Sequence, residues 1–184
     1  WQALAWLRAD ANLTLSVNRI KDYTDYVQHV DTYDNWSETG KTTAMNYGTT
    51  TMLMSPSLTG MARLSFKPWC HASSSLKTME LSMDGKYVGK QYMDNTMTDS
   101  RSIPAYFVSN LAVSYSFPLS GSVGFAREDS IRISFYVNNV FNNMYYADGW
   151  CWKNLIEEDG AVVDGIGVYP QAPINCMLKV SLRF

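Results

Sequence analysis

Residues 175–184 read NCMLKVSLRF, and apolar side chains recur there at every second position. One face carries Cys176, Leu178, Val180, Leu182 and Phe184, whereas the other carries Met177, Lys179, Ser181 and Arg183. A period of two residues predicts a β-strand with two different faces. Because terminal residues are usually polar and frayed, this apolar stretch with its aromatic last residue is expected to be held in a sheet.

The composition differs from that of most water-soluble domains. Aromatic residues make up 14% of the chain and charged residues 17%, where about 25% charged is typical. The formal net charge of −2 gives no reason to expect a nucleic-acid partner. No stretch approaches the roughly 18 consecutive apolar residues of a spanning helix, so a membrane role would have to use β-strands.

The start of the chain and its cysteines add two expectations. No signal peptide is visible and the first residue is Trp1 rather than Met, so the sequence is expected to be a piece of a longer protein. Cys70, Cys151 and Cys176 are an odd number at wide spacing. This spacing matches neither a disulfide framework nor a metal site, and three unpaired thiols are expected.

Alternation with a period of two recurs along the chain, whereas helical periodicity is hard to find. It defines six expected strands: residues 7–17, 47–68, 76–92, 105–117, 129–140 and 175–184. At a tilt of about 40°, residues 7–17 would climb roughly 25 Å, the height of the apolar band of an outer-membrane barrel.

The second of these segments has two interpretations. Ser55-Pro56-Ser57 has the composition of a turn, which would divide residues 47–68 into two strands. The even-numbered positions nevertheless stay apolar on both sides of Pro56. We therefore predict one long strand that is bent at Pro56, where proline removes a ladder hydrogen bond.

The connections predict which ends of the strands lie together. Residues near 1–6, 68–75 and 118–128 fall on one side of a membrane, and the longer stretches 29–46, 93–104 and 141–172 fall on the other. Short inner turns and long outer loops are typical of transmembrane barrels. A soluble β-sandwich, whose strands also alternate, is the competing interpretation. The long strands, the polar faces rich in Ser, Thr and Asn, and the aromatic residues near strand ends weigh against it.

A shared phase across the segments predicts the face that meets lipid. The predicted lipid-facing residues are Leu13, Leu15, Val17, Leu64, Phe66, Leu111, Val113, Ile133, Phe135, Val180 and Leu182. The opposite face carries Asn12, Asn18, Arg63, Glu80, Asp84, Asn110 and Arg132. These polar residues are expected either to line a translocation path or, more simply, to bond to one another or to a plug domain.

An ordered series of motifs resembles one family. The runs WLRADANLTLSVNRIKDYTDYV, TTTMLMSPS, GKYVGKQYMDNT, SIPAYFVSNLAVSYSF, FYVNNVFNNMYYADGW and YPQAPINCMLKVSLRF resemble the carboxyl-terminal part of TonB-dependent outer-membrane receptors of the Bacteroidetes type. Residues 137–146, VNNVFNNMYY, resemble the Asn-Leu-Phe-Asp…Tyr run at the outer end of the penultimate strand in that family.

The resemblance implies an all-β fold in which residues 1–184 supply about six C-terminal strands of a barrel of roughly 22 antiparallel strands. The plug domain, the coupling box and the early strands of the family have no counterpart in this sequence. It also implies that Phe184, with Leu178, Val180 and Leu182, is the signal that the barrel-assembly machinery recognises. The implied location is the outer membrane of a Gram-negative bacterium.

No catalytic constellation stands out, and neither enzyme activity, a cofactor nor a metal is expected. His29 and His71 are expected to be surface histidines. Asp31, Asp34 and Glu38 have loose cation-site spacing without a calcium-loop pattern, and they are interpreted, like IEEDGAVVDG at residues 156–165, as a solvated loop. Tyr145, Tyr146, Trp150 and Trp152 are the candidate ligand-binding residues, because aromatic rings stack on sugars and aromatic ligands; packing at the membrane rim is the alternative.

Three functional hypotheses follow. The first is active import of a scarce, bulky nutrient such as a ferric siderophore, cobalamin or an oligosaccharide, with energy from the TonB complex through an N-terminal region outside this sequence. Its partners would be outer-membrane lipid, the barrel-assembly machinery and a small-molecule or glycan ligand. The second is a passive outer-membrane barrel or an adhesin, and the third is a secreted β-sandwich. The sequence does not identify the transported substrate.

Overall fold

The computed structural model describes residues 4–72, 75–119 and 130–183 of the chain. Within these ranges it contains twelve strands and two short 3-10 helices. The elements are β1 Leu7–Leu15, β2 Arg19–Val30, β3 Glu38–Thr51, β4 Leu58–Phe66, η1 Ser75–Thr78, β5 Glu80–Val88, β6 Gln91–Tyr92, η2 Asp99–Arg101, β7 Ser102–Ile103, β8 Tyr106–Pro118, β9 Ser130–Asn138, β10 Tyr146–Ile156, β11 Val162–Pro170 and β12 Asn175–Arg183. The all-β prediction is confirmed for the described residues.

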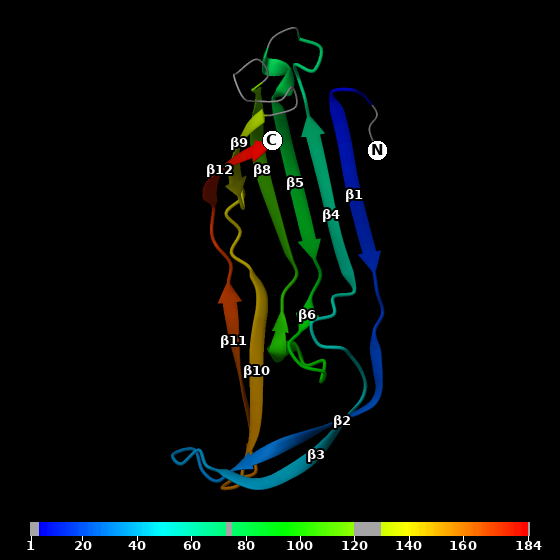
Figure 1. Ribbon diagram of the computed structural model, residues 1–184. Coiled ribbons are helices and arrows are strands. Elements are labelled where there is room, and N and C mark those ends of the chain that lie inside the picture. Colours follow the sequence, from blue (N-terminus) through cyan, green and yellow to red (C-terminus); the bar gives the residue numbers. More distant parts are fainter. Residues whose placement is uncertain (1–3, 73–74, 120–129, 184) are drawn as a thin grey trace.

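Six strands form the main sheet, in the order β1-β4-β5-β8-β9-β12, and every neighbouring pair is antiparallel. Figure 1 shows them side by side in the upper half of the molecule. Each of the six segments predicted from alternation contributes one strand to this sheet. Local periodicity therefore identified the members of the sheet correctly.

Connections of different kinds gather at the two ends of the main sheet. We call the end where β1, β5 and β9 finish the distal end, and the end near both termini the proximal end. Residues 16–57, 89–105 and 139–174 connect strands at the distal end, and the strand ends at Phe66, Glu80, Pro118 and Ser130 lie at the proximal end. The predicted grouping of strand ends is confirmed for the described residues, and most of the predicted 118–128 turn lies outside them.

The distal connections contain a second sheet, with the order β11-β10-β2-β3. Hairpin β2–β3 leaves the β1/β4 side of the main sheet and hairpin β10–β11 leaves the β9/β12 side, and they meet below it in Figure 1. Their contact is a short parallel pairing of Asn154–Ile156 with Gln28–Val30. The two hairpins thereby bridge the two sides of the main sheet at its distal end.

Side chains on the main sheet are distributed in the reverse of the usual way. The register places Phe66, Leu81, Val113, Phe135 and Leu178 in one row across five strands of one face. On this face Phe135 is 45% exposed, while neighbouring Ser134 on the other face is 4% exposed. The buried serines of that other face are Ser65, Ser82, Ser114 and Ser134, whereas Ser109, also buried, shares the face of Leu111. All eleven residues predicted to face lipid are exposed: Leu13, Leu15, Val17, Leu64, Phe66, Leu111, Val113, Ile133, Phe135, Val180 and Leu182.

The buried apolar residues lie at the distal end instead. They are Val27, Val30, Val88, Met93, Ile103 and Ile156, which come from all three distal connections or the strand end beside them. Burying each such side chain contributes about 1.5–3 kcal/mol. The distal connections therefore pack against one another as a small hydrophobic core.

The prediction of one long strand bent at Pro56 is wrong. Strand β3 ends at Thr51 in the second sheet, and β4 begins at Leu58 in the main sheet. The backbone between them bonds to other segments, since Met54 N donates to the oxygen of Tyr92 and Ser16 Oγ donates to the oxygen of Pro56. The unbroken phase of the even positions did not indicate a continuous ladder.

Residues 29–46 and 141–172 were also predicted as loops, and this is only partly right. The first range holds the end of β2 and much of β3, and the second holds all of β10 and β11. Gly165 and Gly167 lie within β11. Among the described residues the main sheet keeps β1 and β12 as edges, so no closed barrel is seen.

A turn rich in asparagine follows β9 and corresponds to the VNNVFNN motif. Asn139 is 2% exposed and has φ of +52°, a left-handed conformation that asparagine tolerates better than most residues. Its Nδ2 donates to the oxygens of Asn143 and Ala172, and its backbone N–H donates to Oδ1 of Asn110. Asn139 thus fastens the end of β9 to β8 and to the residues before β12.

Candidate functional site at the distal end

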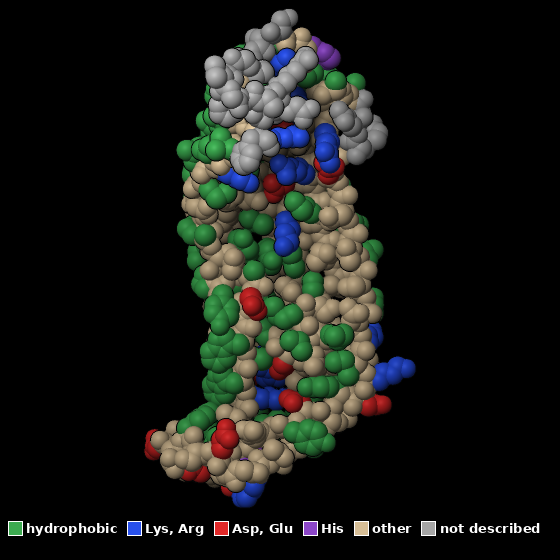
Figure 2. Space-filling view, viewed as in Figure 1, with side chains coloured by type: hydrophobic (Ala, Val, Ile, Leu, Met, Phe, Trp, Pro, Cys, Tyr) green, Lys and Arg blue, Asp and Glu red, His purple; other side chains and the backbone are tan. Residues whose placement is uncertain are grey.

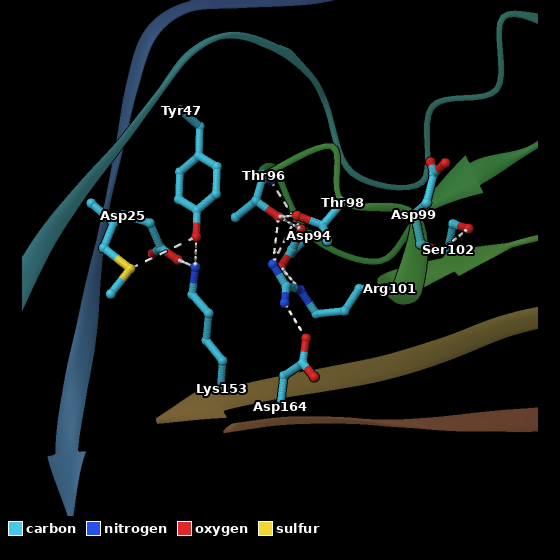
Figure 3. A network of polar contacts seen from close by, with 11 residues as sticks. Asp25, Tyr47, Asp94, Thr96, Thr98, Asp99, Arg101, Ser102, Lys153 and Asp164 are labelled. Carbon is cyan, nitrogen blue, oxygen red and sulfur yellow. Dashed lines mark hydrogen bonds and ion pairs between the residues drawn. The ribbon is translucent and has the colours of Figure 1, made fainter. Parts of the chain in front are cut away.

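A polar network in the distal connections is centred on Arg101, at the end of η2 (Figure 3). Only 4% of Arg101 is exposed. Its Nε donates to Oδ2 of Asp94 at 2.7 Å, and its Nη1 donates to Asp164 of β11. Its Nη2 donates to the hydroxyls of Thr96 at 2.8 Å and Thr98 at 3.0 Å. Arg101 therefore ties the 89–105 connection to hairpin β10–β11.

A second contact, also drawn in Figure 3, joins the two long hairpins through Lys153 of β10. Its Nζ forms an ion pair with Asp25 of β2 and donates to the hydroxyl of Tyr47 of β3 at 2.8 Å. The ammonium group also lies 4.6 Å from the centre of the Tyr47 ring, within the range of a cation–π interaction. Lys153 thus bonds to both strands of the facing hairpin.

Hydrogen bonds and ion pairs hold Arg101, Asp94 and Lys153 in their ionised forms. Desolvation lowers the pKa of Arg101, but its hydrogen bond and attraction to Asp94 outweigh that cost, so its pKa is raised. Desolvation raises the pKa of Asp94, yet the hydrogen bonds from Thr96 and Arg101 prevail and lower it. The pKa of Lys153 is raised in the same way, because Asp25 and Tyr47 offset its desolvation. Such fully paired groups position structure rather than exchange protons at neutral pH.

The four aromatic candidates from the sequence separate into two places. Tyr145 stacks on Tyr106, with ring centres 4.7 Å apart and planes at 27°, while Tyr146 begins β10 opposite Pro170. Trp150 and Trp152 lie further along β10, and Trp152 contacts Trp36 edge to face at 5.4 Å. Trp36, in the turn between β2 and β3, joins this group only through the fold.

The acidic and histidine candidates have structural partners. His29 is not a bare surface residue, because its Nδ1 lies 3.1 Å from Glu157 and its Nε2 lies 2.7 Å from Thr43. His71 is exposed, as expected. Asp31 accepts hydrogen bonds from the backbone N–H groups of Thr32 and Ser37, and these bonds lower its pKa. It therefore organises a turn.

Asp34 and Glu38 lie in the turn and at the start of β3 beside Asp31. In the described ranges no group of three or more His, Cys, Asp or Glu side chains is arranged to hold a metal ion. Cys70, Cys151 and Cys176 are unpaired, which confirms the prediction of three free thiols. Burial raises the pKa of the Cys151 thiol, which disfavours the reactive thiolate form.

Near the proximal end, the serine-bearing face of the main sheet is hollowed. The hollow has a volume of about 340 Å³ and is lined by Arg8, Asp10, Arg63, Lys67, Glu80 and Arg132, among others. Figure 2 shows Lys and Arg side chains gathered toward this end of the molecule. Arg132 Nη2 lies 3.4 Å from Glu80 Oε2, and Arg63 donates to Ser82 at 3.2 Å. The predicted polar residues Arg63, Glu80 and Arg132 are thus brought together here.

The other predicted polar residues of this face bond separately. Asn110 donates to Oδ2 of Asp84 at 2.8 Å, and Asn18 donates to the hydroxyl of Ser55 at 2.6 Å. Asn12 stands opposite Met61 in the register of β1 and β4. These pairs agree with the expectation that polar residues on this face bond to one another.

Leu178, Val180 and Leu182 of the proposed insertion signal are exposed on one face of β12. Phe184 lies outside the described residues, so its role stays a prediction. Arg101, Lys153 and their partners Asp25 and Asp164 were missed by the sequence analysis. The segments that carry them are far apart in the chain, and the local spacing of residues does not predict such contacts.

The comparisons with known proteins concern the fold. No helix in the described part of the chain is both long and apolar enough to span a bilayer. No protein-family model and no curated protein matches the sequence. Similar solved structures include the unliganded ferric citrate transporter FecA, which is 18% identical over 78% of this chain and 20% of its own, with a TM-score of 0.51.

A second similar structure is the ferric preacinetobactin receptor BauA from Acinetobacter baumannii. It is 17% identical over 74% of this chain and 16% of its own length, with a TM-score of 0.48. The chain thus spans about a fifth or less of the length of these two proteins. At this level of identity, the likeness to FecA concerns the antiparallel strand fold alone.

Proposed function

We propose that the chain is the C-terminal part of a TonB-dependent receptor in the outer membrane of a Gram-negative bacterium. The whole protein would import a scarce, bulky nutrient of the siderophore, cobalamin or oligosaccharide class, with energy from the TonB complex. A plug domain, a coupling box and the remaining barrel strands would lie outside residues 1–184. The proposal includes no enzymatic step and no cofactor.

The main support for this proposal is the distribution of side chains on the main sheet, which is the reverse of that in a water-soluble protein. Its exposed face presents Leu, Val, Ile and Phe in rows that run across neighbouring strands, while Ser residues are buried on the other face. In water such a face would be a large apolar patch that must be covered. In a bilayer it is the surface that meets lipid, and the polar face lines the lumen.

The distal connections support a receptor rather than a simple channel. Transmembrane barrels have longer connections on the extracellular side, and here those connections form a second sheet with its own core. Lys153 joins its two hairpins through Asp25, and Arg101 ties the 89–105 connection to it through Asp164, both by partly buried ion pairs. An ordered structure of this kind at one end of the strands is suited to bind a ligand before transport. The fold likeness to FecA is consistent with this role.

The proposed partners follow from the same placement. Lipid would contact the Val113 and Phe135 face, and TonB would act through a region outside this chain. The barrel-assembly machinery would recognise the alternating apolar residues Leu178, Val180 and Leu182, with Phe184. We expect Phe184→Asp to lower the outer-membrane level of the receptor sharply and Phe184→Tyr to have a mild effect, because a tyrosine suits the interface.

Cysteine labelling in intact outer membranes tests the topology. In a whole protein with Cys70, Cys151 and Cys176 replaced by Ala, single cysteines are placed at Val113 or Phe135, and at Ser114 or Ser134 as neighbouring controls. A water-soluble maleimide is expected to spare the first pair, whose thiols lie in lipid and stay protonated, and to label the second pair, which faces the aqueous lumen. The opposite pattern would mean that the apolar face is turned away from lipid.

Uptake measurements separate the functional alternatives. Cells that carry only this receptor are grown with a panel of ferric siderophores, cobalamin or oligosaccharides, with and without the TonB complex. Active import predicts growth on one member of the panel that disappears without the complex. Growth that survives its loss indicates a passive barrel. Lack of growth on every member, together with cell adhesion that depends on the protein, indicates an adhesin.

A further inference from the structure

Three tryptophans form one exposed group on the second sheet. We call Trp36, Trp150 and Trp152 the indole strip. Their side chains stay accessible, with exposures of 46%, 52% and 37%. Trp150 and Trp152 are two residues apart on β10 and therefore share a face. The Trp36 ring contacts the Trp152 ring edge to face, with the two ring planes at 90°. It therefore lies across one end of the pair.

Two glycines in the neighbouring strand β11 leave room for the two indole rings. Trp150 stands opposite Gly167 and Trp152 opposite Gly165 in the register of β10 and β11. A Cβ atom at Gly167 would lie 2.4 Å from the Trp150 ring, and one at Gly165 would lie 2.7 Å from the Trp152 ring. Each indole therefore lies against bare backbone on one side and is open to solvent on the other.

Polar groups flank the rings on the same face. Asp148 precedes Trp150 by two residues and is exposed, and Asn154 follows Trp152 by two residues. Within the described part of the chain, the Asn154 side chain makes no hydrogen bond, and Asp148 accepts one only from the N–H of Gly149. Tyr169 stands opposite Asp148 and is 55% exposed. Groups that can form hydrogen bonds thus lie on both sides of the two exposed indole rings.

The indole strip lies on the opposite side of β10 from Lys153, whose side chain points to Asp25 and Tyr47. It is therefore separate from the polar networks of Figure 3. Trp150 and Trp152 belong to the second sheet and not to the main sheet, and their flanking carboxylate and amide argue against insertion in lipid.

We propose that the indole strip binds an uncharged saccharide with glucose-type pyranose rings. The equatorial hydroxyls of such a ring leave two faces of C–H groups, which stack on indoles, while the hydroxyls at its rim bond to carboxylates and amides. Trp150 and Trp152 would each face one sugar, and Asp148 and Asn154 would accept from or donate to the hydroxyls. The binding site does not depend on the proposed transport function.

The experiment measures saccharide binding directly. The whole protein in detergent micelles is titrated by calorimetry with cellohexaose, maltohexaose and xylohexaose, and tryptophan emission is recorded in parallel. Saturable binding of at least one of the three oligosaccharides is expected, with a change in tryptophan emission. Replacement of both Trp150 and Trp152 by Ala is expected to raise Kd about tenfold or more. Binding of none of the three would overturn the proposal.

Two further variants locate the site. Trp69→Ala removes a tryptophan of comparable exposure, 40%, at the proximal end and is expected to leave Kd unchanged. Gly167→Ala leaves all three tryptophans in the sequence but displaces the Trp150 ring from the backbone of Gly167. It is therefore expected to weaken binding. If Trp69→Ala weakens binding as much as loss of Trp150 and Trp152, the saccharide binds elsewhere and the assignment is wrong. Because uptake is not measured, failure here leaves the transport proposal to its own test.

Discussion

The hydroxyl of Ser114 donates a hydrogen bond to the hydroxyl of Ser134, 2.9 Å away, in the buried face of the main sheet. One residue earlier on β8 and one later on β9, Val113 and Phe135 stand opposite each other with their side chains exposed. A β-sheet in water normally buries the valine and phenylalanine and exposes the serines. The pairing of the two hydroxyls makes the reversed arrangement tolerable, because each buried polar group has a partner.

The two faces of β12 predict a difference between neighbouring lysine substitutions. Leu178 and Met177 are both exposed but lie on opposite faces, opposite Phe135 and Tyr136 respectively. Leu178→Lys would place a charge in lipid and is expected to cost about 2–4 kcal/mol of folding free energy. Met177→Lys, which points to the polar face, is expected to cost less than about 1 kcal/mol. Urea-dependent folding of the whole protein into lipid vesicles measures both. Equal costs would contradict the assignment of faces.

Much of the main sheet was predictable because its information is local. Alternation along each segment assigns residues such as Leu111 and Val113 to one face, and strands that follow one another in the chain become neighbours. The distal end was not predictable in this way. The parallel pairing of Asn154 with Gln28 and the contact of Arg101 with Asp164 join segments far apart in sequence. No periodicity within either segment specifies its partner.

The error at Pro56 has a similar origin. Residues 52–57 keep the apolar phase of a strand, but their backbone groups bond to Ser16, Tyr92 and the side chain of Asn95 rather than to a continuing ladder. A turn can keep the phase by coincidence, whereas its hydrogen-bond partners come from elsewhere in the fold. Phase alone therefore cannot distinguish a bent strand from two strands.

Asn139 is expected to be more important for folding than the asparagine beside it. Asn139→Ala would remove two side-chain donations and one acceptance, and it would force alanine into positive φ. A loss of about 2–4 kcal/mol is expected. Asn138→Ala, the control, removes one exposed bond to Asn175 and should cost about 1 kcal/mol or less. The same vesicle folding assay measures both, and equal losses would show that the turn tolerates alanine.

Substitution of Arg101 is expected to destabilise the distal end locally rather than the whole fold. Arg101→Met would leave Asp94 and Asp164 without their common partner, at an expected cost of about 2–3 kcal/mol. Lys90→Met is the control in the same connection, because the Lys90–Asp99 ion pair is exposed and such pairs contribute at most about 1 kcal/mol. Hydrogen exchange should show lost protection in β10 and β11 for Arg101→Met only, with the main sheet unchanged. Unaltered protection there would mean that Arg101 does not hold the hairpin.

Glu157 connects the tips of the two long hairpins. Its Oε2 accepts from Nζ of Lys41 at 2.9 Å, and its Oε1 accepts from the hydroxyl of Thr39 at 2.8 Å. These two hydrogen bonds are the main reason that the pKa of Glu157 falls from 4.5 to about 2. The carboxylate is therefore favoured in the folded hairpins relative to the unfolded chain.

The pH dependence follows from the sign of that shift. Because the pKa is lower in the folded state, the stabilisation by Glu157 is complete above about pH 4.5 and is lost as the pH falls toward about 2. We expect the hydrogen-exchange protection of residues 38–44, corrected for the intrinsic exchange rate, to fall between pH 5 and pH 3. Glu157→Gln is nearly isosteric and lacks the titrating group, so its protection should be lower at pH 5 and change less over this interval. If the variant loses as much protection as the parent protein, other carboxyl groups control the tips and Glu157 does not.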